Sequence, residues 1–341
     1  MDEAQFSIAL LWLFIFIYSI AGALDFGAGF WSMVYFNRKD TKAGVIANKY
    51  LSPAWEITNV LLAMFVVALV SFFPNATFTL GTVLMIPANL ILVLLSIRTA
   101  FMVFAYSVEE GYRKILNHIS GIAGILILAL LVVVLPLTHG GYIREVNGVL
   151  QLPLSKVFTS PTVYAFIGLA ISMTLYLSAL LLADYASLTG DGSGFAIYRK
   201  HSIWIGPFTV LFGFLIIFTI KNEATWLYVN LWNYSLWLIL SVVAFLIGYW
   251  FILRSTKDKN VENRSSGIAL LLTIVQLFLA SYAYGKAHLP YLVYPATIHE
   301  SITNEEMYRA LVIIYIVGTV LMIPAFIWHW RLFIRNREYV K

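Results

Sequence analysis

An all-α polytopic membrane protein is the fold class that this sequence predicts, with nine transmembrane helices arranged as two four-helix bundles plus one peripheral helix. Hydrophobic residues make up 61% of the 341 positions and charged residues only 11%, whereas a soluble globular domain carries about 25% charged residues. The mean hydropathy is +0.84. The sequence contains no cysteine, which excludes disulfide bonds, thiolate metal sites and catalytic thiols.

Nine apolar blocks, each long enough to cross about 30 Å of hydrocarbon, predict the nine helices. The first block has no basic segment before it and no small-residue cleavage site, so we expect a retained helix and not a signal peptide. Ser52 and Pro53 are a good N-cap and a good first helical residue, and they predict that the second helix begins there. Short turns such as residues 74–76 connect antiparallel neighbours. The blocks cover approximately residues 6–36, 54–73, 79–106, 118–138, 161–187, 202–220, 228–253, 266–286 and 308–331.

The basic residues predict how the helices cross the membrane. With the N-terminus outside, sixteen of the 22 lysine and arginine residues fall in cytoplasmic segments, five fall in outer segments and Arg98 lies within a span. Because this bias sets topology, we expect an outer N-terminus and a cytoplasmic C-terminus. Residues 1–341 form a single membrane domain, in which residues 1–138 and 161–286 are candidate halves of a parallel repeat and residues 308–331 are the final helix.

Three acidic residues lie within the predicted spans, Asp25, Glu56 and Asp184, and Arg98 is a basic residue in the interior of one. A carboxylate in a membrane-length helix costs at least about 2.5 kcal/mol, so such residues are functional candidates by default. By the predicted topology all four lie in the cytoplasmic half of the membrane. Carboxyl groups in a low-dielectric interior can exchange protons near neutral pH, so the set indicates a proton route that enters from the cytoplasmic side. The alternative is that Arg98 only neutralises Asp25 as a structural pair.

Local sequence adds a structural interpretation to each candidate. Gly22, Asp25 and Gly29 share one helix face, and small residues let another helix approach closely, so we assign these glycines and Gly27 to helix packing and expect Asp25 to face a helix, not lipid. The helix dipole favours Glu56 in a first turn. This local role explains Glu56 as well as a functional one does.

Asp184 lies near the C-terminal end of its predicted helix, where the dipole disfavours an acid. We therefore keep it as a third candidate for the proton pathway, with exposure at the membrane surface as the alternative.

The six histidines all fall at or beyond span ends, and none occupies the middle of a span. Haem or copper ligands in a helix bundle project inward from within a helix. We therefore predict that this chain binds no redox metal of its own. Most tryptophans and tyrosines also lie near span ends, as expected for an aromatic belt at the lipid headgroups.

Three segments resemble subunit II of the cytochrome bd-type quinol oxidases, the bacterial respiratory terminal oxidases. The first helix, through Asp25 to Gly29, is similar to the family's aspartate-hydrophobe-glycine-small-glycine signature. Residues 53–56, with Trp55, match its proline-x-tryptophan-acid element, and Arg98 stands where the family has an arginine after a run of aliphatic residues. Length and helix count also fit, so the resemblance covers essentially the whole chain. Glu56 departs from the aspartate of some members.

The resemblance implies a heterodimer in the bacterial cytoplasmic membrane. Its partner, subunit I, would bind two b-type haems and one d-type haem and oxidise menaquinol or ubiquinol, with oxygen reduced to water. This chain would bind no haem, stabilise subunit I and supply the cytoplasmic proton route, with Asp25 and Glu56 at the motif positions. Small single-helix accessory subunits and a bound quinone are further expectations, whereas nucleic acid is not.

Two other functions are consistent with the residues alone. A proton-coupled secondary transporter also has buried charges and internal repeats, but its substrate groups lie on broken helices near the midplane. Pro87, Asn89 and Pro324 could break helices here, yet no polar cluster surrounds them in the sequence. A purely structural assembly subunit would leave Asp25 as an ion-paired anchor.

Overall fold

The computed structural model describes residues 3–38, 40–105, 107–146, 149–254, 265–302 and 305–329. Helices dominate this part of the chain, and two short antiparallel hairpins accompany them. The long helices are α1 (Glu3–Val34), α2 (Ala43–Phe72), α4 (Met85–Phe104), α5 (Glu110–Thr138), α7 (Pro161–Leu188), α8 (Gly192–Glu223), α10 (Ser235–Arg254), α11 (Ser265–His288) and α12 (Glu305–His329). The short elements are α3 (Pro74–Val83), α6 (Leu154–Thr159), α9 (Thr225–Trp232), β1 (Arg144–Val146), β2 (Val149–Gln151), β3 (Tyr291–Val293) and β4 (Ala296–Thr297).

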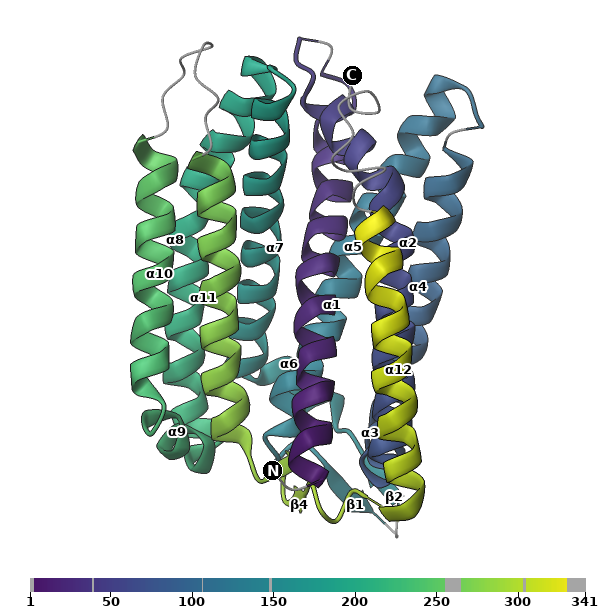
Figure 1. The fold of residues 1–341 in the computed structure, drawn as a ribbon, viewed down its shortest axis with the longest axis vertical. Coiled ribbons are helices and arrows are strands. Elements are labelled where there is room, and N and C mark those ends of the chain that lie inside the picture. Colours follow the sequence, from purple (N-terminus) through teal and green to yellow (C-terminus); the bar gives the residue numbers. More distant parts are fainter. Residues whose placement is uncertain are drawn as a thin grey trace.

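The helices form two groups that meet at α1 and α7 (Figure 1). In the first group α1 packs against α2 and α5, and α4 packs against α5. In the second group α7 packs against α8 and α11, and α10 packs against α11. Helix α12 lies apart from the second group and packs against α2. This arrangement agrees with the predicted two four-helix bundles plus one peripheral helix.

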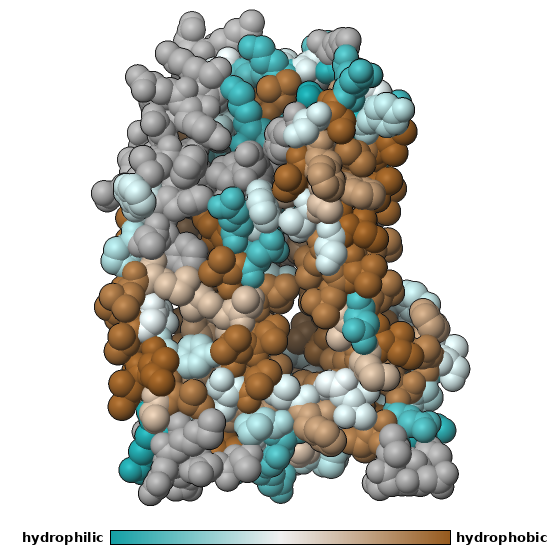
Figure 2. Space-filling model, turned by 90° about the vertical axis from the view of Figure 1, so that its right-hand side faces the viewer, coloured by the Kyte–Doolittle hydropathy of each residue, from teal (hydrophilic) through white to brown (hydrophobic). Residues whose placement is uncertain are grey.

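The all-helical membrane fold is confirmed. Among the described residues, eight helices are long and apolar enough to cross a membrane, and α12 holds a shorter apolar stretch, Tyr308–Met322. These nine helices correspond to the nine predicted blocks. On the face of the molecule formed by α12 and its neighbours, Figure 2 shows mainly apolar residues across the middle and hydrophilic residues towards the ends.

Several helix boundaries differ from the predicted blocks: α5 and α8 begin earlier, and the seventh block is divided between α9 and α10. The second helix begins at Ala43 and not at Ser52, so the predicted start is wrong. Its extra turns are amphipathic: Ala43, Ile46 and Ala47 are buried in the main core, which is the cluster of apolar side chains shared chiefly by α1, α2, α7 and α8. Burial of such a stripe stabilises a helix more than a favourable cap does. The third block is divided between α3 and α4, which are separated by a single residue. Pro74 is the first residue of α3 and not part of a turn.

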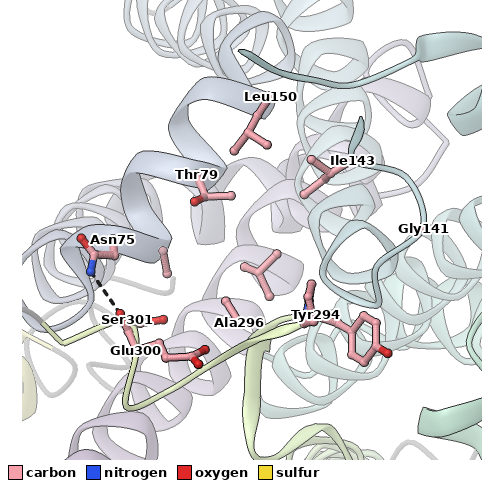
Figure 3. Close-up of a pocket in the computed structure, with 12 residues that line it drawn as sticks. Asn75, Thr79, Gly141, Ile143, Leu150, Tyr294, Ala296, Glu300 and Ser301 are labelled. Atoms are coloured by element: carbon pink, nitrogen blue, oxygen red, sulfur yellow. Dashed lines mark hydrogen bonds between the residues drawn. The ribbon is translucent and has the colours of Figure 1, made fainter. Parts of the chain in front are cut away.

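The hairpins, α6 and α9 lie at the end of the bundle where α1 begins (Figure 1). We call this end the outer end, following the orientation that the basic residues predict, and the opposite end the inner end. A pocket of about 370 Å³ opens among these loops, lined by residues of α3, β2 and the segment around β4. Asn75 bridges its wall by donating a hydrogen bond to the Glu300 carbonyl, at 3.0 Å (Figure 3).

Candidate functional site

Asp25 of α1 and Arg98 of α4 form a buried ion pair. Arg98 Nη2 lies 2.8 Å from Asp25 Oδ1 and donates a hydrogen bond to it. The Asp25 side chain is only 1% exposed and the Arg98 side chain only 2%. Burial of both charges carries a large desolvation penalty that their mutual attraction has to offset. The structure therefore brings together the two residues that the sequence singled out first.

Helix α5 provides the space that the arginine needs. A Cβ on Gly124 would lie 3.4 Å from Arg98 Nε and 3.4 Å from the Phe26 ring, so the missing side chain leaves room for the guanidinium. Arg98 Cζ sits 4.7 Å from the centroid of the Phe26 ring, a cation–π distance. Ser120 of α5 also donates a 3.3 Å hydrogen bond to the Arg98 carbonyl. Arg98 is thus held by α1 and α5 together.

The carboxylate of Asp25 is paired through only one of its oxygens. Among the described residues, Oδ2 has no hydrogen-bond partner. The phenol groups of Tyr18 in α1 and Tyr50 in α2 both interact electrostatically with this carboxylate. A carboxylate oxygen that is held in a fixed position and accepts no hydrogen bond can take up and release a proton.

The motif glycines have different surroundings. At Gly27 a Cβ would collide with Ser178 of α7 and would lie 2.9 Å from the Thr174 carbonyl, so α1 and α7 can approach only because a side chain is missing. The Gly29 carbonyl lies 3.2 Å from the Cβ position of Gly121 in α5. Gly22 differs, because the atoms nearest to a Cβ there belong to side chains of its own helix, Phe26 and Tyr18.

The surroundings of Glu56 and Asp184 differ from those of the ion pair. The Glu56 side chain is exposed on the surface of α2, while Trp55 beside it is partly buried against the main core. Asp184 is half-buried and faces the start of α11, where the Gly267 amide is its hydrogen-bond partner. Asp25, in contrast, faces α4.

Residues 4–333 match the family model for cytochrome bd terminal oxidase subunit II. The chain belongs to this family. A curated relative from Bacillus subtilis (strain 168), named by inference a cytochrome bd menaquinol oxidase subunit II, is 45% identical over 340 residues, which are 99% of this chain and 98% of the relative.

A solved structure extends the likeness to three dimensions. The bd oxidase from Geobacillus thermodenitrificans contains a chain that matches with a TM-score of 0.83 and 34% identity, over 98% of this chain and 100% of that one. This chain is therefore subunit II of a bd-type quinol oxidase, a multi-pass membrane protein of a bacterial respiratory complex.

The bd subunit II also has polar contacts at the inner end that the sequence did not single out. Ser32 of α1 and Asn117 of α5 lie within hydrogen-bond distance, with Asn117 Nδ2 3.3 Å from Ser32 Oγ. Tyr35 bonds to the His201 ring, and Trp31 Nε1 donates a 3.0 Å bond to Ser178 Oγ. Ser32 follows Asp25 by seven residues, two helical turns, and this spacing is the signal that could have identified it.

A second cluster, at the outer end, joins the two groups of helices. His139 Nε2 lies 2.5 Å from the Tyr284 hydroxyl, and Thr138 Oγ1 lies 3.2 Å from His288 Nε2. Burial, together with the neighbouring His288 ring, lowers the pKa of His139 to about 3. His139 is therefore neutral and contributes hydrogen bonds instead of charge.

The described residues contain no group of three or more histidine, cysteine, aspartate or glutamate side chains that could hold a metal ion. Four of the histidines use a ring nitrogen for a contact within the chain, with Lys114, Tyr284, Tyr35 and Tyr291 as partners of His118, His139, His201 and His288. That this subunit binds no haem remains a prediction.

Proposed function

We propose that this subunit II carries protons from the cytoplasmic side of the membrane towards the oxygen-reducing centre of the bd oxidase, and that it stabilises the haem-bearing subunit I. The observation that carries the proposal is the buried Asp25–Arg98 pair, in which the arginine fixes one carboxylate oxygen and the other has no hydrogen-bond partner among the described residues. Buried intramembrane acids mark ion and proton pathways more often than they serve as anchors.

The chemistry of the oxidase gives such a route a purpose. Reduction of one oxygen molecule to two waters consumes four protons, while oxidation of two quinols releases four. If the consumed protons come only from the inside and the released ones leave outside, the reaction generates proton motive force without pumping. The haem groups of subunit I supply the electron transfer, and the part of this chain is to bind, orient and pass protons.

Arg98 has two tasks in this scheme. Its positive charge offsets the penalty of a carboxylate in the membrane interior, and its hydrogen bond fixes Oδ1 so that Oδ2 is the oxygen that gains or loses a proton. The Phe26 ring contacts the guanidinium, and the hydrogen bond that Ser120 of α5 donates to the Arg98 carbonyl holds the backbone of this residue in place. Proton transfer then requires little rearrangement of the helices.

Glu56 supports the proposal that this chain contacts and stabilises subunit I. Its side chain is exposed within a helix long and apolar enough to span the membrane. An exposed carboxylate in a span faces protein or water in preference to lipid, so we assign this side of α2 to contact with subunit I or to the cytoplasmic entrance of the route. Asp184 remains a third candidate, although its contact with the start of α11 gives it a structural role.

The substrate we propose is menaquinol, as the name of the Bacillus subtilis relative states for that protein. It would be oxidised at subunit I. From the family resemblance we also propose single-helix accessory subunits and a bound quinone. The composition of the purified complex tests both.

The experiment that tests the proton role is Asp25→Asn in the complete oxidase complex. The amide retains an oxygen to accept the Arg98 hydrogen bond, but it neither exchanges a proton nor balances the charge of the guanidinium. We therefore expect a lower yield of assembled complex. In the fraction that assembles with normal haem spectra we expect turnover about 100-fold lower, the scale of one lost acid–base group. The measurements are quinol-driven oxygen consumption and proton uptake in vesicles. Wild-type turnover with normal haem spectra would leave Asp25 only a structural role.

A further inference from the structure

Two buried polar atoms near the ion pair have no hydrogen-bond partner among the described residues: Asp25 Oδ2 and the Tyr18 hydroxyl. Asp25 is 1% and Tyr18 is 8% exposed. Nearly all buried polar groups in proteins bind another protein group or an ordered water. Each of these two atoms therefore needs a partner that the described residues do not provide.

The two residues share one face of α1. Tyr18 precedes Asp25 by seven residues, which places it two turns, about 10 Å, nearer the outer end. Gly22 lies between them on this face. A Cβ on Gly22 would be 3.9 Å from Tyr18 Cζ and 3.4 Å from the Phe26 ring, so the hydroxyl end of the Tyr18 ring lies beside Gly22, one turn closer to Asp25 than its own Cα.

The charges around Tyr18 and Asp25 belong to the same few groups. Arg98 from α4 pairs with Asp25, Tyr50 from α2 interacts electrostatically with Asp25, and Tyr18 interacts with both Asp25 and Arg98. A water molecule between the carboxylate and the phenol would have two strong polar partners, and buried waters typically bridge groups of this kind.

We propose that Asp25 Oδ2 and the Tyr18 hydroxyl share a bound water, and that Tyr18 positions this water as the next step of the proton route on the outer side of Asp25. The inference rests on the proposed function of Asp25. In the transfer, Asp25 Oδ2 takes up a proton from the inner side and gives it to the water, the water gives one of its own to the phenol oxygen, and the hydroxyl releases its original proton towards subunit I, where oxygen reduction consumes it. Each oxygen gains one proton and loses one, so no oxidant or reductant is needed.

The test is Tyr18→Phe in the complete oxidase, compared with Tyr176→Phe as a matched control. Tyr176 is also fully buried, but it lies in α7 against Phe245 (ring centroids 5.6 Å apart). The first readout is the infrared band of the Asp25 carboxyl, identified by its loss in Asp25→Asn. We expect the band to shift in Tyr18→Phe and to stay unchanged in Tyr176→Phe.

The second readout is kinetic. We expect Tyr18→Phe to lower the maximal turnover about five-fold, equivalent to the net strength of one hydrogen bond, with an unchanged KM for quinol and unchanged haem spectra. An unshifted band together with wild-type turnover would overturn the proposal. A shifted band with wild-type turnover would overturn the positioning role and leave only the water site.

The two proposals fail in distinguishable ways. If Asp25→Asn keeps wild-type turnover, the proton role of Asp25 fails, whereas the infrared band still reports whether Tyr18 and Asp25 share a water. If Asp25→Asn is slow and Tyr18→Phe behaves like the Tyr176→Phe control in both readouts, only the inference about Tyr18 fails.

Discussion

Asp25 and Arg98 each need the opposite charge of the other in order to be buried. Each is almost fully buried, and a buried charge without its partner is strongly destabilising. A deleterious substitution of one residue is therefore ambiguous, because the effect can come from the unpaired charge as well as from a lost proton route. Removing both charges together separates these two causes.

We predict that Arg98→Met alone prevents stable assembly, because it leaves the Asp25 carboxylate buried without compensation, at a cost of about 3–5 kcal/mol. The double variant Asp25→Leu with Arg98→Met should recover assembly, since replacing both partners of a buried pair by apolar residues is often neutral. The measurements are the yield and melting temperature of the haem-bearing complex.

Turnover of the double variant then tests the role of the pair. We expect a well-assembled complex that remains slow, because position 25 no longer has a carboxylate to exchange protons. A double variant that assembles and also turns over at the wild-type rate would show that the pair is an anchor only.

At the scale of helices, the contact between α1 and α7 depends on Gly27. The atoms that a Cβ would meet include the Thr174 carbonyl, which is backbone and cannot rotate away. Small residues at helix contacts let backbones approach closely in membranes. The same contact carries the hydrogen bond from Trp31 to Ser178, one turn further along α1.

We predict that Gly27→Ala lowers the melting temperature of the complex, because the added methyl group forces the two helices apart, with an overpacking cost of about 1–3 kcal/mol. Gly213→Ala in α8 is the control, since nothing lies within 4 Å of the added Cβ there. Equal melting temperatures for the two variants would contradict the close contact.

The sequence predicted the helices well because hydrophobic length is a local property. It also identified Asp25 and Arg98, since charges inside spans are rare enough to be conspicuous. It did not predict the start of α2, because burial of Ala43 and Ile46 against other helices decides that boundary. Nor did it separate Gly27, which contacts α7, from Gly22, whose nearest side-chain neighbours belong to its own helix. Both distinctions depend on neighbours that are distant in the sequence.

Glu56 illustrates a different limit. The sequence indicated an acid near the start of a span, and the structure places its side chain at the surface of this subunit. Whether that surface meets subunit I depends on a second polypeptide. Prediction from one chain can therefore indicate such a residue but cannot assign its contacts.

At the scale of the whole molecule, the two groups of helices are joined at both ends. Near the inner end α1 packs against α7, and at the outer end His139 and Thr138 of the first group meet Tyr284 and His288 of α11. Trp226 next to α11 donates a further bond, 3.1 Å long, to the His139 carbonyl. Because His139 is only 3% exposed, this outer junction requires a neutral ring.

The junction therefore predicts a pH dependence of stability. The pKa of His139 is about 3 in the folded protein, because of burial and the neighbouring His288 ring, against 6.5 for an ordinary histidine. Between these values the unfolded state binds a proton that the folded state excludes, so stability falls as the pH falls from 6.5 towards 3, by up to about 1.4 kcal/mol per pH unit for one proton. His139→Gln keeps a hydrogen-bonding side chain but cannot titrate, so its melting temperature should fall less steeply with acidification than that of the wild type.

His118→Gln, which alters a ring bonded to a carbonyl of its own helix, should keep the wild-type slope. Identical slopes for His139→Gln and the wild type, measured on the purified complex, would mean that a charged His139 is tolerated and that the junction does not depend on its neutrality.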